Sequence, residues 1–576
     1  MKSSGAGHVA VFLDHCGGAL SDLLDEEMVR YASGLPQVVS CNVEEDLSRP
    51  GGLARLASRL KQAKADRVVI AGRSPRWYER SFRSLAVSGG LNPYMFLVVN
   101  LQDQVAGWIP DVARARQKTR GLLAKTVKEA LLLRPIRREE IEIPNRAVVV
   151  GGGAVGLCAA SALADAGIEV TLLTEAEEIG EEGDVLPYLW DEPFEMGSWL
   201  GERVEEVKGH PKIDVKTSVE IRGFEGRLGD YHIEIEDPSG RREIVEGSAV
   251  ILATGCDSVP NREGIFGHRR FISLRAMESM LERGGETLAD EKGRPVRTVV
   301  FLLDLVNEAS KIDSASAMKN AILLKKDHDC AVYVICRNVK VCLDGMESQY
   351  RSARDMGVVF IKYDDPPRLS LVDSQVNVEV KEVSTRMRGD QYSLSILTDL
   401  VVSGERFVPS WQTKRLAGMF GIPSTREGYL MDDNPQFCLT GANRRGLFLA
   451  GGRGFPLPLD EALKEAEAAA AQVARLVSSG TYAYDLAVAV VNPAKCALCL
   501  TCLRVCPHRA VVVEKYAAGN VYTTERGEEG GKSEAARVLA VQCYGCGICV
   551  ASCPTRAIAL NHLTDQELSL QVREWS

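Results

Sequence analysis

Two runs of cysteines near the end of the chain constrain its fold and chemistry more than any other feature. The same spacing occurs twice, first from Cys496 to Pro507 and again from Cys543 to Pro554. Two residues between neighbouring cysteines let three sulfur atoms of one tight loop reach three metal atoms of a compact cluster. The sequence CPHRAV at 506–511 also matches CPTRAI at 553–558, so we predict a module with pseudo-twofold symmetry.

This spacing is similar to that of bacterial-type ferredoxins with two [4Fe–4S] clusters, in which the cysteine before the proline ligates the other cluster. The first cluster is therefore assigned to Cys496, Cys499, Cys502 and Cys553. The second cluster is assigned to Cys543, Cys546, Cys549 and Cys506. Zinc sites or disulfides are the alternatives, but zinc closes with four ligands and does not need a doubled pattern with an exchanged fourth ligand. Such a module, predicted at 485–562 with a charged insert at Glu525–Lys532, carries single electrons.

Composition and charge narrow the class of protein further. A length of 576 residues suits roughly three or four domains, and a net charge of −9 argues against nucleic acid as a partner. The sequence has no apolar run near the ~18 residues of a membrane span, and its first residues predict a strand and not a signal peptide. Eight of the 16 cysteines lie outside the module, and no two of these are three positions apart. We expect a cytoplasmic protein, peripheral to a membrane complex only through partners, whose other cysteines are small buried side chains.

Residues 1–140 are predicted to form a small doubly wound α/β module. Helical patterns alternate with four candidate strands, at His8–Leu13, Gln37–Cys41, Arg67–Ala71 and Met95–Val99. Ligands of such a parallel sheet sit at the carboxyl ends of its strands. The loops there, Asp14–Gly17 and Gly72–Pro75, offer one His and one Cys, which make a poor metal site. We expect a scaffold without a cluster, followed by a linker at 133–145.

A glycine-rich turn follows the apolar strand Arg146–Val150. Gly151 permits the tight turn, Gly153 lets backbone approach a pyrophosphate, and Gly156 lets the next helix pack closely. The helix starts near Ala154, and a second strand ends at Leu173, which is the full context of a dinucleotide-binding unit.

The end of that second strand departs from the usual pattern. An acidic residue normally holds the ribose hydroxyls there, but Thr174 occupies the position and Glu175 lies one residue beyond it. A hydroxyl binds ribose more weakly than a carboxylate does. Five carboxylates fall within residues 175–182 and would repel a pyrophosphate that came near them.

Two further strands complete the pattern of an FAD domain, predicted at 145–295 and 400–480. One ends in Ala253-Thr254-Gly255, and the other ends in Ala450-Gly451-Gly452 before a long alanine-rich helix. Between them, residues 296–400 predict the second α/β domain that binds nicotinamide nucleotides in two-nucleotide flavoenzymes. Its first strand runs into Asp304 with no glycine for a pyrophosphate to approach, so we expect no NAD(P) there.

With these pieces in order, the chain resembles the A subunit of heterodisulfide reductase and its relatives over nearly its whole length. The resemblance rests on the three glycine-containing segments, the double cysteine pattern, and the segments Ser74–Arg76, Gly90–Tyr94 and Leu563–Glu567, the last within a predicted C-terminal helix at 563–576. It implies an α/β protein with a thioredoxin-reductase-like FAD domain built from two dinucleotide folds. It also implies electron traffic within a larger complex, sometimes with flavin-based bifurcation.

The chain also departs from this family, which predicts a pared-down paralog. Arg73 stands where the family has a cluster cysteine, Asn307–Met318 contains no cysteine, and the inserted ferredoxin module of the flavin domain is missing. Phe455-Pro456-Leu457 replaces a Gly-Pro-Lys run whose lysine is thought to lie near the flavin. Losing that cation would change the redox behaviour of the flavin.

These observations leave two functions open. The first is an electron-transfer subunit that passes electrons between FAD and two [4Fe–4S] clusters to other redox subunits of a heterodisulfide-reductase-like complex. The second is a non-catalytic scaffold and cluster wire that has lost its flavin. A free-standing NAD(P)H-dependent reductase is disfavoured by the missing second glycine turn, and direct disulfide reduction is disfavoured by the missing redox cysteine pair.

Overall fold

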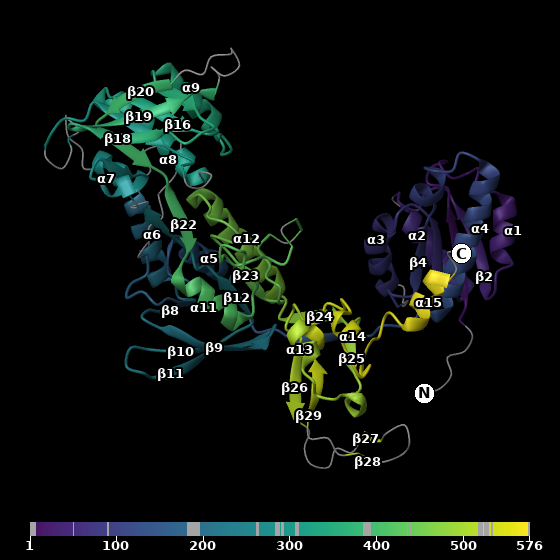
Figure 1. The fold of residues 1–576 in the computed structure, drawn as a ribbon. Helices are drawn as coiled ribbons and strands as arrows, with labels where there is room; N and C mark the ends of the chain where they lie inside the picture. The colour runs from purple at the N-terminus through teal and green to yellow at the C-terminus, as the bar shows by residue number, and fades with distance from the viewer. Residues whose placement is uncertain are drawn as a thin grey trace. The chain divides into compact units, whose positions relative to one another are not determined.

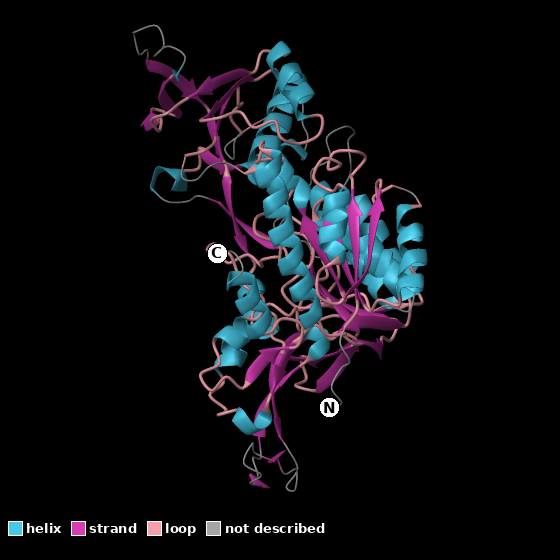
Figure 2. Ribbon diagram, turned by 90° about the vertical axis from the view of Figure 1, so that its right-hand side faces the viewer, coloured by secondary structure: helices cyan, strands magenta, loops and turns pink. Residues whose placement is uncertain are grey.

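The computed structural model divides into two compact units, and each is described by itself. One unit comprises 1–140 together with 483–576, and the other comprises 141–482. Both units mix helices and strands (Figure 1 and Figure 2). The structure describes the chain apart from residues 1–6, 50, 89–91, 181–195, 261–263, 283–288, 290–292, 306–309, 384–392, 435, 438, 516–521, 524–528, 531–533 and 574–576.

The N-terminal part of the first unit is a four-stranded parallel sheet between two helical layers. Its elements are β1 (Val9–Asp14), α1 (Glu26–Ser33), β2 (Val38–Glu44), α2 (Gly52–Ala63), β3 (Arg67–Gly72), α3 (Pro75–Ser88), β4 (Phe96–Asn100) and α4 (Val112–Leu132). The strand order is β2-β1-β3-β4. Successive side chains of a strand point to opposite faces, so Val11 packs with α1 and α4 whereas Phe12 packs with α2 and α3. The fold is the doubly wound module that the alternating pattern predicted.

The second unit contains a five-stranded parallel sheet built around the glycine-rich turn. Its elements are β6 (Arg146–Val150), α5 (Ala154–Asp165), β7 (Glu169–Leu173), α6 (Met196–Gly209), β8 (Ile213–Lys216), β12 (Ala249–Leu252), β23 (Leu447–Leu449) and α12 (Leu459–Val477). The strand order is β23-β12-β6-β7-β8. Helices α5 and α12 pack against each other, and both bury many alanines, whose small side chains allow close approach. The chain between β8 and β12 forms an antiparallel meander of three strands, β9 (Glu220–Arg227), β10 (Asp230–Glu236) and β11 (Arg242–Gly247).

A second parallel sheet in the same unit forms the middle domain. Its elements are β14 (Phe271–Ser273), α7 (Leu274–Glu282), β15 (Thr298–Leu302), α8 (Lys311–His328), β16 (Ala331–Cys336), α9 (Met346–Asp355), β17 (Val359–Lys362) and β21 (Leu400–Ser403). The order is β14-β21-β15-β16-β17. An antiparallel sheet adjoins it, with β18 (Arg368–Val372), β19 (Gln375–Lys381) and β20 (Ser393–Thr398). Strands β13 (Cys256–Pro260) and β22 (Glu405–Pro409) pair with each other on the two chain segments that lead into and out of this domain.

The middle sheet corrects the predicted domain boundaries. Residues 296–400 were expected to form this domain, but β14 lies before that range and β21 extends past it. Both strands are hydrogen-bonded members of the sheet. Strands of three or four residues carry too little periodicity to be recognised in the sequence, which explains the error.

The C-terminal module is built from two small antiparallel strand pairs. Its elements are β25 (Ala489–Val491), η3 (Pro493–Lys495), α13 (Thr501–Val505), β26 (Val511–Lys515), β29 (Glu534–Val538), η4 (Ala540–Gln542), α14 (Ile548–Ala551) and β30 (Ile558–Leu560). The two-residue strands β27 (Tyr522–Thr523) and β28 (Glu529–Gly530) pair with each other between β26 and β29, in a stretch that lies mostly outside the described residues. After the module, α15 (Asp565–Arg573) contacts α4.

The predicted linker at 133–145 is wrong in one respect. It contains β5 (Arg138–Glu142), which pairs with β24 (Thr481–Asp485). The boundary between the two compact units runs through both strands. The sequence did not predict β5, because its charged side chains are mostly exposed and show no apolar alternation.

Candidate functional site

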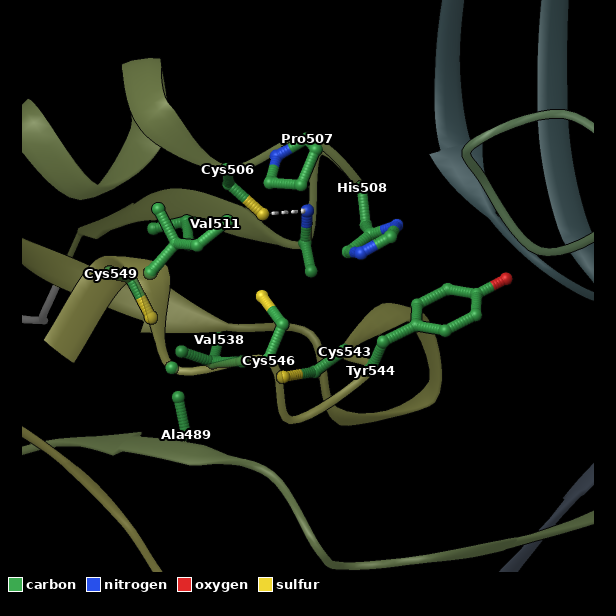
Figure 3. A pocket seen from close by; sticks show the side chains of 13 residues that line it. Ala489, Cys506, Pro507, His508, Val511, Val538, Cys543, Tyr544, Cys546 and Cys549 are labelled. Atoms are coloured by element: carbon green, nitrogen blue, oxygen red, sulfur yellow. Dashed lines mark hydrogen bonds between the residues drawn. The ribbon is translucent and has the colours of Figure 1, made fainter. Parts of the chain in front are cut away.

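Four cysteine side chains line one cavity of the C-terminal module. They are Cys506 from the first repeat and Cys543, Cys546 and Cys549 from the second. Figure 3 shows their sulfur atoms around a common space. The rest of the wall is largely apolar and includes Ala489, Val511 and Val538. The structure therefore brings together the four residues assigned to the second cluster.

A second cavity repeats this arrangement with the other four cysteines. Its lining contains Cys496, Cys499 and Cys502 from the first repeat together with Cys553 from the second. Each cavity thus takes three cysteines from one loop and the proline-preceded cysteine from the other repeat. That grouping is the one expected of two [4Fe–4S] clusters with exchanged fourth ligands.

Strand pairing explains why the fourth cysteines are exchanged. Cys506 is followed by β26, which pairs with β29, the strand that leads into the second cysteine loop. Cys553 is followed by β30, which pairs with β25, the strand that leads into the first loop. Each strand therefore carries the cysteine before it toward the loop of the other repeat.

The two cysteine loops share one unusual backbone conformation. Gly545 and Gly547 of the second loop have φ angles of 67° and 79°, and Leu498 and Leu500 at the matching positions have 52° and 60°. This left-handed region costs a non-glycine residue about 1–2 kcal/mol. The first loop accepts that cost at two leucines, which indicates that the geometry of the loop is required and not incidental.

Hydrogen bonds to sulfur support the thiolate forms that an iron–sulfur cluster needs. The Ala510 N–H donates to Cys506 Sγ over 3.3 Å, and the Ala557 N–H donates to Cys553 Sγ over 3.2 Å. Hydrogen bonds from Thr501 hold the pKa of Cys499 below its usual value. Burial, reinforced by the neighbouring cysteines, raises the pKa of Cys549 to about 11. Cluster binding would have to offset that penalty, because only thiolates ligate iron.

The predicted flavin residues meet at one edge of the second unit. The turn Gly151–Gly156 follows β6, Thr174 and Glu175 follow β7, Ala253–Gly255 follows β12, and Ala450–Gly452 follows β23. These four strands are neighbours and run parallel, so their carboxyl ends lie side by side. Dinucleotides bind at such an edge in doubly wound sheets.

The glycine turn has the shape that a pyrophosphate needs. Gly151 has a φ angle of 121°, and a Cβ there would lie 2.1 Å from the Ala253 carbonyl oxygen. A Cβ on Gly156 would lie 1.8 Å from the Gly151 carbonyl oxygen, so the helix approaches the turn closely. At Gly153, by contrast, a Cβ would meet no heavy atom within 4 Å among the described residues. The turn thus leaves space beside the start of α5, whose N–H groups favour an anion.

Thr174 lies beneath the glycine turn. A Cβ on Gly152 would come within 2.9 Å of the Thr174 side chain, and the Thr174 hydroxyl accepts a hydrogen bond from the Ala176 N–H over 3.3 Å. The hydroxyl can still donate one hydrogen bond to a ribose oxygen. Thr174 therefore fits the position, with less binding capacity than a carboxylate would have.

The charge of Glu175 has partners that the sequence did not reveal. Its carboxylate forms an ion pair with Arg415 and accepts a hydrogen bond from the Gln412 side chain over 2.8 Å, both residues of α11 (Trp411–Phe420). Burial raises the pKa of Glu175, whereas Arg415 and Gln412 act in the opposite direction. The expected repulsion of a pyrophosphate is thus weaker at Glu175, while Glu177 and Glu178 face solvent. No local pattern marks α11 as part of this site.

The loop after β23 contains a partly buried cation four residues before the position where the family has lysine. Leu457, where the family has lysine, is buried. Arg453 is 13% exposed and forms ion pairs with Asp432 over 2.5 Å and Glu465 over 2.6 Å. Glu465 also accepts the Gly451 N–H over 3.2 Å. A positive charge is therefore present in this loop, but two carboxylates neutralise it.

The N-terminal sheet places Cys16 and Arg73 together at its carboxyl edge. Cys16 is buried, and burial raises its pKa to about 11. The Arg73 guanidinium donates to the Cys16 carbonyl oxygen over 3.1 Å and lies 3.5 Å from an Asp46 carboxylate oxygen. Arg73 thus fills the place of the missing family cysteine with hydrogen bonds and an ion pair. That this module carries no cluster stays a prediction.

A carboxylate follows strand β15 of the middle domain. Asp304 follows β15 with a φ angle of 60°, and its side chain accepts the Arg337 N–H over 2.9 Å. A carboxylate at this edge would repel the pyrophosphate of a nicotinamide nucleotide. The expectation that NAD(P) does not bind there stays a prediction, and residues 306–309 lie outside the described part of the chain.

Comparison with protein families finds two matching domains. Residues 495–558 match the 4Fe-4S dicluster domain, and residues 109–303 match the pyridine nucleotide-disulphide oxidoreductase family. These matches confirm the predicted combination of an iron–sulfur domain with a flavoprotein-type α/β domain. Among solved structures, thioredoxin reductase of T. acidophilum is 18% identical with a TM-score of 0.38, covering 58% of this chain and 98% of that one.

Characterised relatives match the chain along most of its length. The A subunit of the H(2):CoB-CoM heterodisulfide,ferredoxin reductase of Methanothermobacter thermautotrophicus is 24% identical, covering 88% of this chain and 91% of the relative. The A subunit of the ferredoxin/F(420)H(2)-dependent CoB-CoM heterodisulfide reductase of Methanosarcina acetivorans is also 24% identical, covering 88% and 75%. These findings confirm the resemblance inferred from the order of the motifs. Within the described residues, no helix is long and apolar enough to cross a membrane.

Proposed function

We propose that this homologue of the heterodisulfide reductase A subunit is an electron-transfer protein that uses FAD and two [4Fe–4S] clusters. One observation carries the proposal: two cavities of one small module are each lined by four cysteines contributed by both repeats. Cys496, Cys499, Cys502 and Cys553 would hold one cluster, and Cys506, Cys543, Cys546 and Cys549 would hold the other. Clusters ligated in this way accept and donate single electrons.

The flavin site is proposed at the edge formed by β6, β7, β12 and β23. Gly151, Gly153 and Gly156 would admit the pyrophosphate beside α5, and Ala154 is the first residue of that helix. Thr174 and Glu175 would face the ribose. The remaining contacts would come from Thr254, Gly255, Gly451 and Gly452, of which Thr254 is held by a 3.0 Å hydrogen bond with Thr413. Bound FAD exchanges two electrons at once or one at a time, which couples pair transfer to single-electron clusters.

The chain's own residues would bind and position these groups and would not act on a substrate. We propose that partner subunits carry any substrate chemistry, since the relatives are named as subunits of heterodisulfide reductases. Purification from its source with identification of the bound proteins would test this. Recovery of the chain with other redox subunits supports the proposal, whereas a chain that is always isolated alone contradicts it.

The alternative function is a cluster wire that has lost its flavin. Thr174 favours it, because a threonine replaces the usual carboxylate and already accepts one hydrogen bond from the backbone. Flavin, iron and sulfide measured on the same anaerobically purified sample separate the two functions. One FAD with two clusters per chain supports the first, and two clusters with a near absence of FAD, even after incubation with FAD, supports the second.

A further inference from the structure

Three glycines border open space at the proposed flavin edge. Gly153, Gly255 and Gly452 each lie three residues past the end of a parallel strand, and the three strands, β6, β12 and β23, are neighbours in the sheet. A Cβ on Gly153 or Gly255 would meet no heavy atom within 4 Å among the described residues. A Cβ on Gly452 would come no closer than 3.8 Å, to the Gly255 carbonyl oxygen. The backbone at these three positions is therefore accessible to a ligand.

The backbone N–H of Gly452 is available to such a ligand. Gly452 has a φ angle of 128°, which glycine adopts without strain. The N–H groups of Ala450 and Gly454, two residues to either side, donate to backbone carbonyl oxygens over 3.0 Å and 2.9 Å. In the described part of the chain, the Gly452 N–H has no such partner. An acceptor oxygen of a cofactor can therefore take this hydrogen bond.

The carboxylate of Glu465, on α12, holds the chain on both sides of Gly452. Its Oε2 accepts the Gly451 N–H over 3.2 Å, and its Oε1 accepts the Arg453 Nε–H over 2.6 Å. Glu465 and Arg453 are each 13% exposed, so this ion pair is largely shielded from solvent. Gly451 also packs against α5, because a Cβ there would lie 2.8 Å from the Val155 side chain. The loop is thus tied to α12 and packed against α5.

Such a tether matters because two consecutive glycines form this part of the loop. Gly451 and Gly452 have φ angles of 69° and 128°. Glycine loses more conformational freedom on ordering than any other residue. A loop that is ordered before the ligand arrives avoids that loss during binding, and the binding affinity rises accordingly.

We propose that Glu465 is a positioning residue for the flavin, whose carboxylate orients the Gly452 N–H toward an oxygen of bound FAD. This inference rests on the proposed function, because it assumes that FAD binds at this edge. Asp432 provides the comparison. Its carboxylate also forms an ion pair with Arg453, over 2.5 Å, but no described contact joins it to the backbone of Gly451 or Gly452.

Glu465→Gln and Asp432→Asn form a charge-matched pair of variants, since each replaces one carboxylate beside Arg453 with a neutral amide. An amide has a single acceptor oxygen. Glu465→Gln can therefore keep only one of its two contacts, whereas Asp432→Asn can keep the contact that Oδ2 makes with Arg453. Equilibrium titration of the full-length chain with FAD should show a Kd at least tenfold higher in Glu465→Gln. This ratio equals about 1.4 kcal/mol, of the order of the cost of ordering one backbone residue. The Kd of Asp432→Asn should change less than twofold.

Hydrogen exchange resolved to single amides provides a second readout that a general loss of stability would not reproduce. Without FAD, the Gly451 amide should exchange at least tenfold faster in Glu465→Gln than in Asp432→Asn, while amides in the middle of α12 exchange equally in both. In the unmodified chain, the Gly452 amide should exchange rapidly without FAD and become protected when FAD is added. Thermal unfolding without FAD shows whether each variant is folded.

The possible outcomes separate this inference from the proposed function. An unchanged Kd in Glu465→Gln, or equal losses of affinity in the two variants, overturns the inference and leaves the proposed function intact. A Gly452 amide that FAD does not protect in the unmodified chain overturns it in the same way. An unmodified chain that binds no FAD overturns both the inference and the flavin part of the proposed function. If Glu465→Gln does not fold, the protection of Gly452 in the unmodified chain still decides the question.

Discussion

Replacing Gly153 by alanine tests the flavin site because the added methyl group should disturb the cofactor and not the fold. Gly153 has φ −79° and ψ −178°, a conformation open to any residue, and a Cβ there meets no heavy atom within 4 Å in the described part of the chain. Alanine is a poorer N-cap than glycine by about 0.5–1 kcal/mol. The loss of backbone freedom in the unfolded chain offsets this by about 0.4–1 kcal/mol. The net change in the free energy of unfolding without FAD is therefore expected to lie within about 0.5 kcal/mol.

The effect on FAD should be much larger. The second glycine of such a turn is where backbone approaches the pyrophosphate, so the methyl group would occupy the space of a phosphate oxygen. FAD at 100 times its Kd stabilises a binding protein by about 2.7 kcal/mol. Thermal unfolding with and without FAD should show this gain in the unmodified chain and little of it in Gly153→Ala.

The control for this experiment is Gly201→Ala in α6. Gly201 is exposed, and a Cβ there also meets no heavy atom within 4 Å among the described residues. Alanine should stabilise the helix by up to about 1 kcal/mol and leave FAD binding unchanged. Retention of full FAD affinity by Gly153→Ala would refute the assignment of this turn to the pyrophosphate.

Three further outcomes are expected from the geometry. Cys506→Ala should reduce iron from about eight to about four atoms per chain. Adding Cys543→Ala to this variant should remove no more iron, whereas adding Cys496→Ala should remove the remaining iron. If Cys543→Ala removes the remaining iron and Cys496→Ala does not, the exchange of ligands is contradicted. Gly545→Ala should destabilise the module by about 2 kcal/mol or more and speed iron loss to a chelator. The reason is that the added Cβ would lie 2.5 Å from a carbonyl oxygen, on a residue whose φ angle is 67°. An unchanged rate of iron loss would argue against this loop geometry. NADH and NADPH should not bleach the flavin of the isolated chain, since Asp304 follows β15, where a glycine would be needed for a pyrophosphate to approach. Rapid bleaching by either nucleotide would disprove this.

Short sequence patterns were sufficient to predict the fold class and the candidate binding residues of this protein. A repeated run of cysteines spaced by two residues, each ending in a cysteine before proline, favours a compact polynuclear cluster over zinc or disulfides. A glycine-rich turn between a strand and a helix favours a dinucleotide. Both patterns depend on backbone geometry within a dozen residues, so the eight cysteines and the Gly151–Gly156 turn could be predicted as candidate sites without a structure. The order of strands and helices predicted the doubly wound N-terminal module for the same reason.

Tertiary structure decided the features that depend on residues far apart in the sequence. Arg415 lies 240 positions from Glu175, and only the fold places its charge on that carboxylate. The three-residue strand β14 and the charged strand β5 could be recognised only from the strands that pair with them in the structure. The matched cavities show this most clearly, because Thr555 and Cys499 belong to different repeats and line the same cavity. The cysteine spacing is identical in both repeats, whereas the side chains that share each cavity with the cysteines come from both repeats and are brought together only by the folded chain.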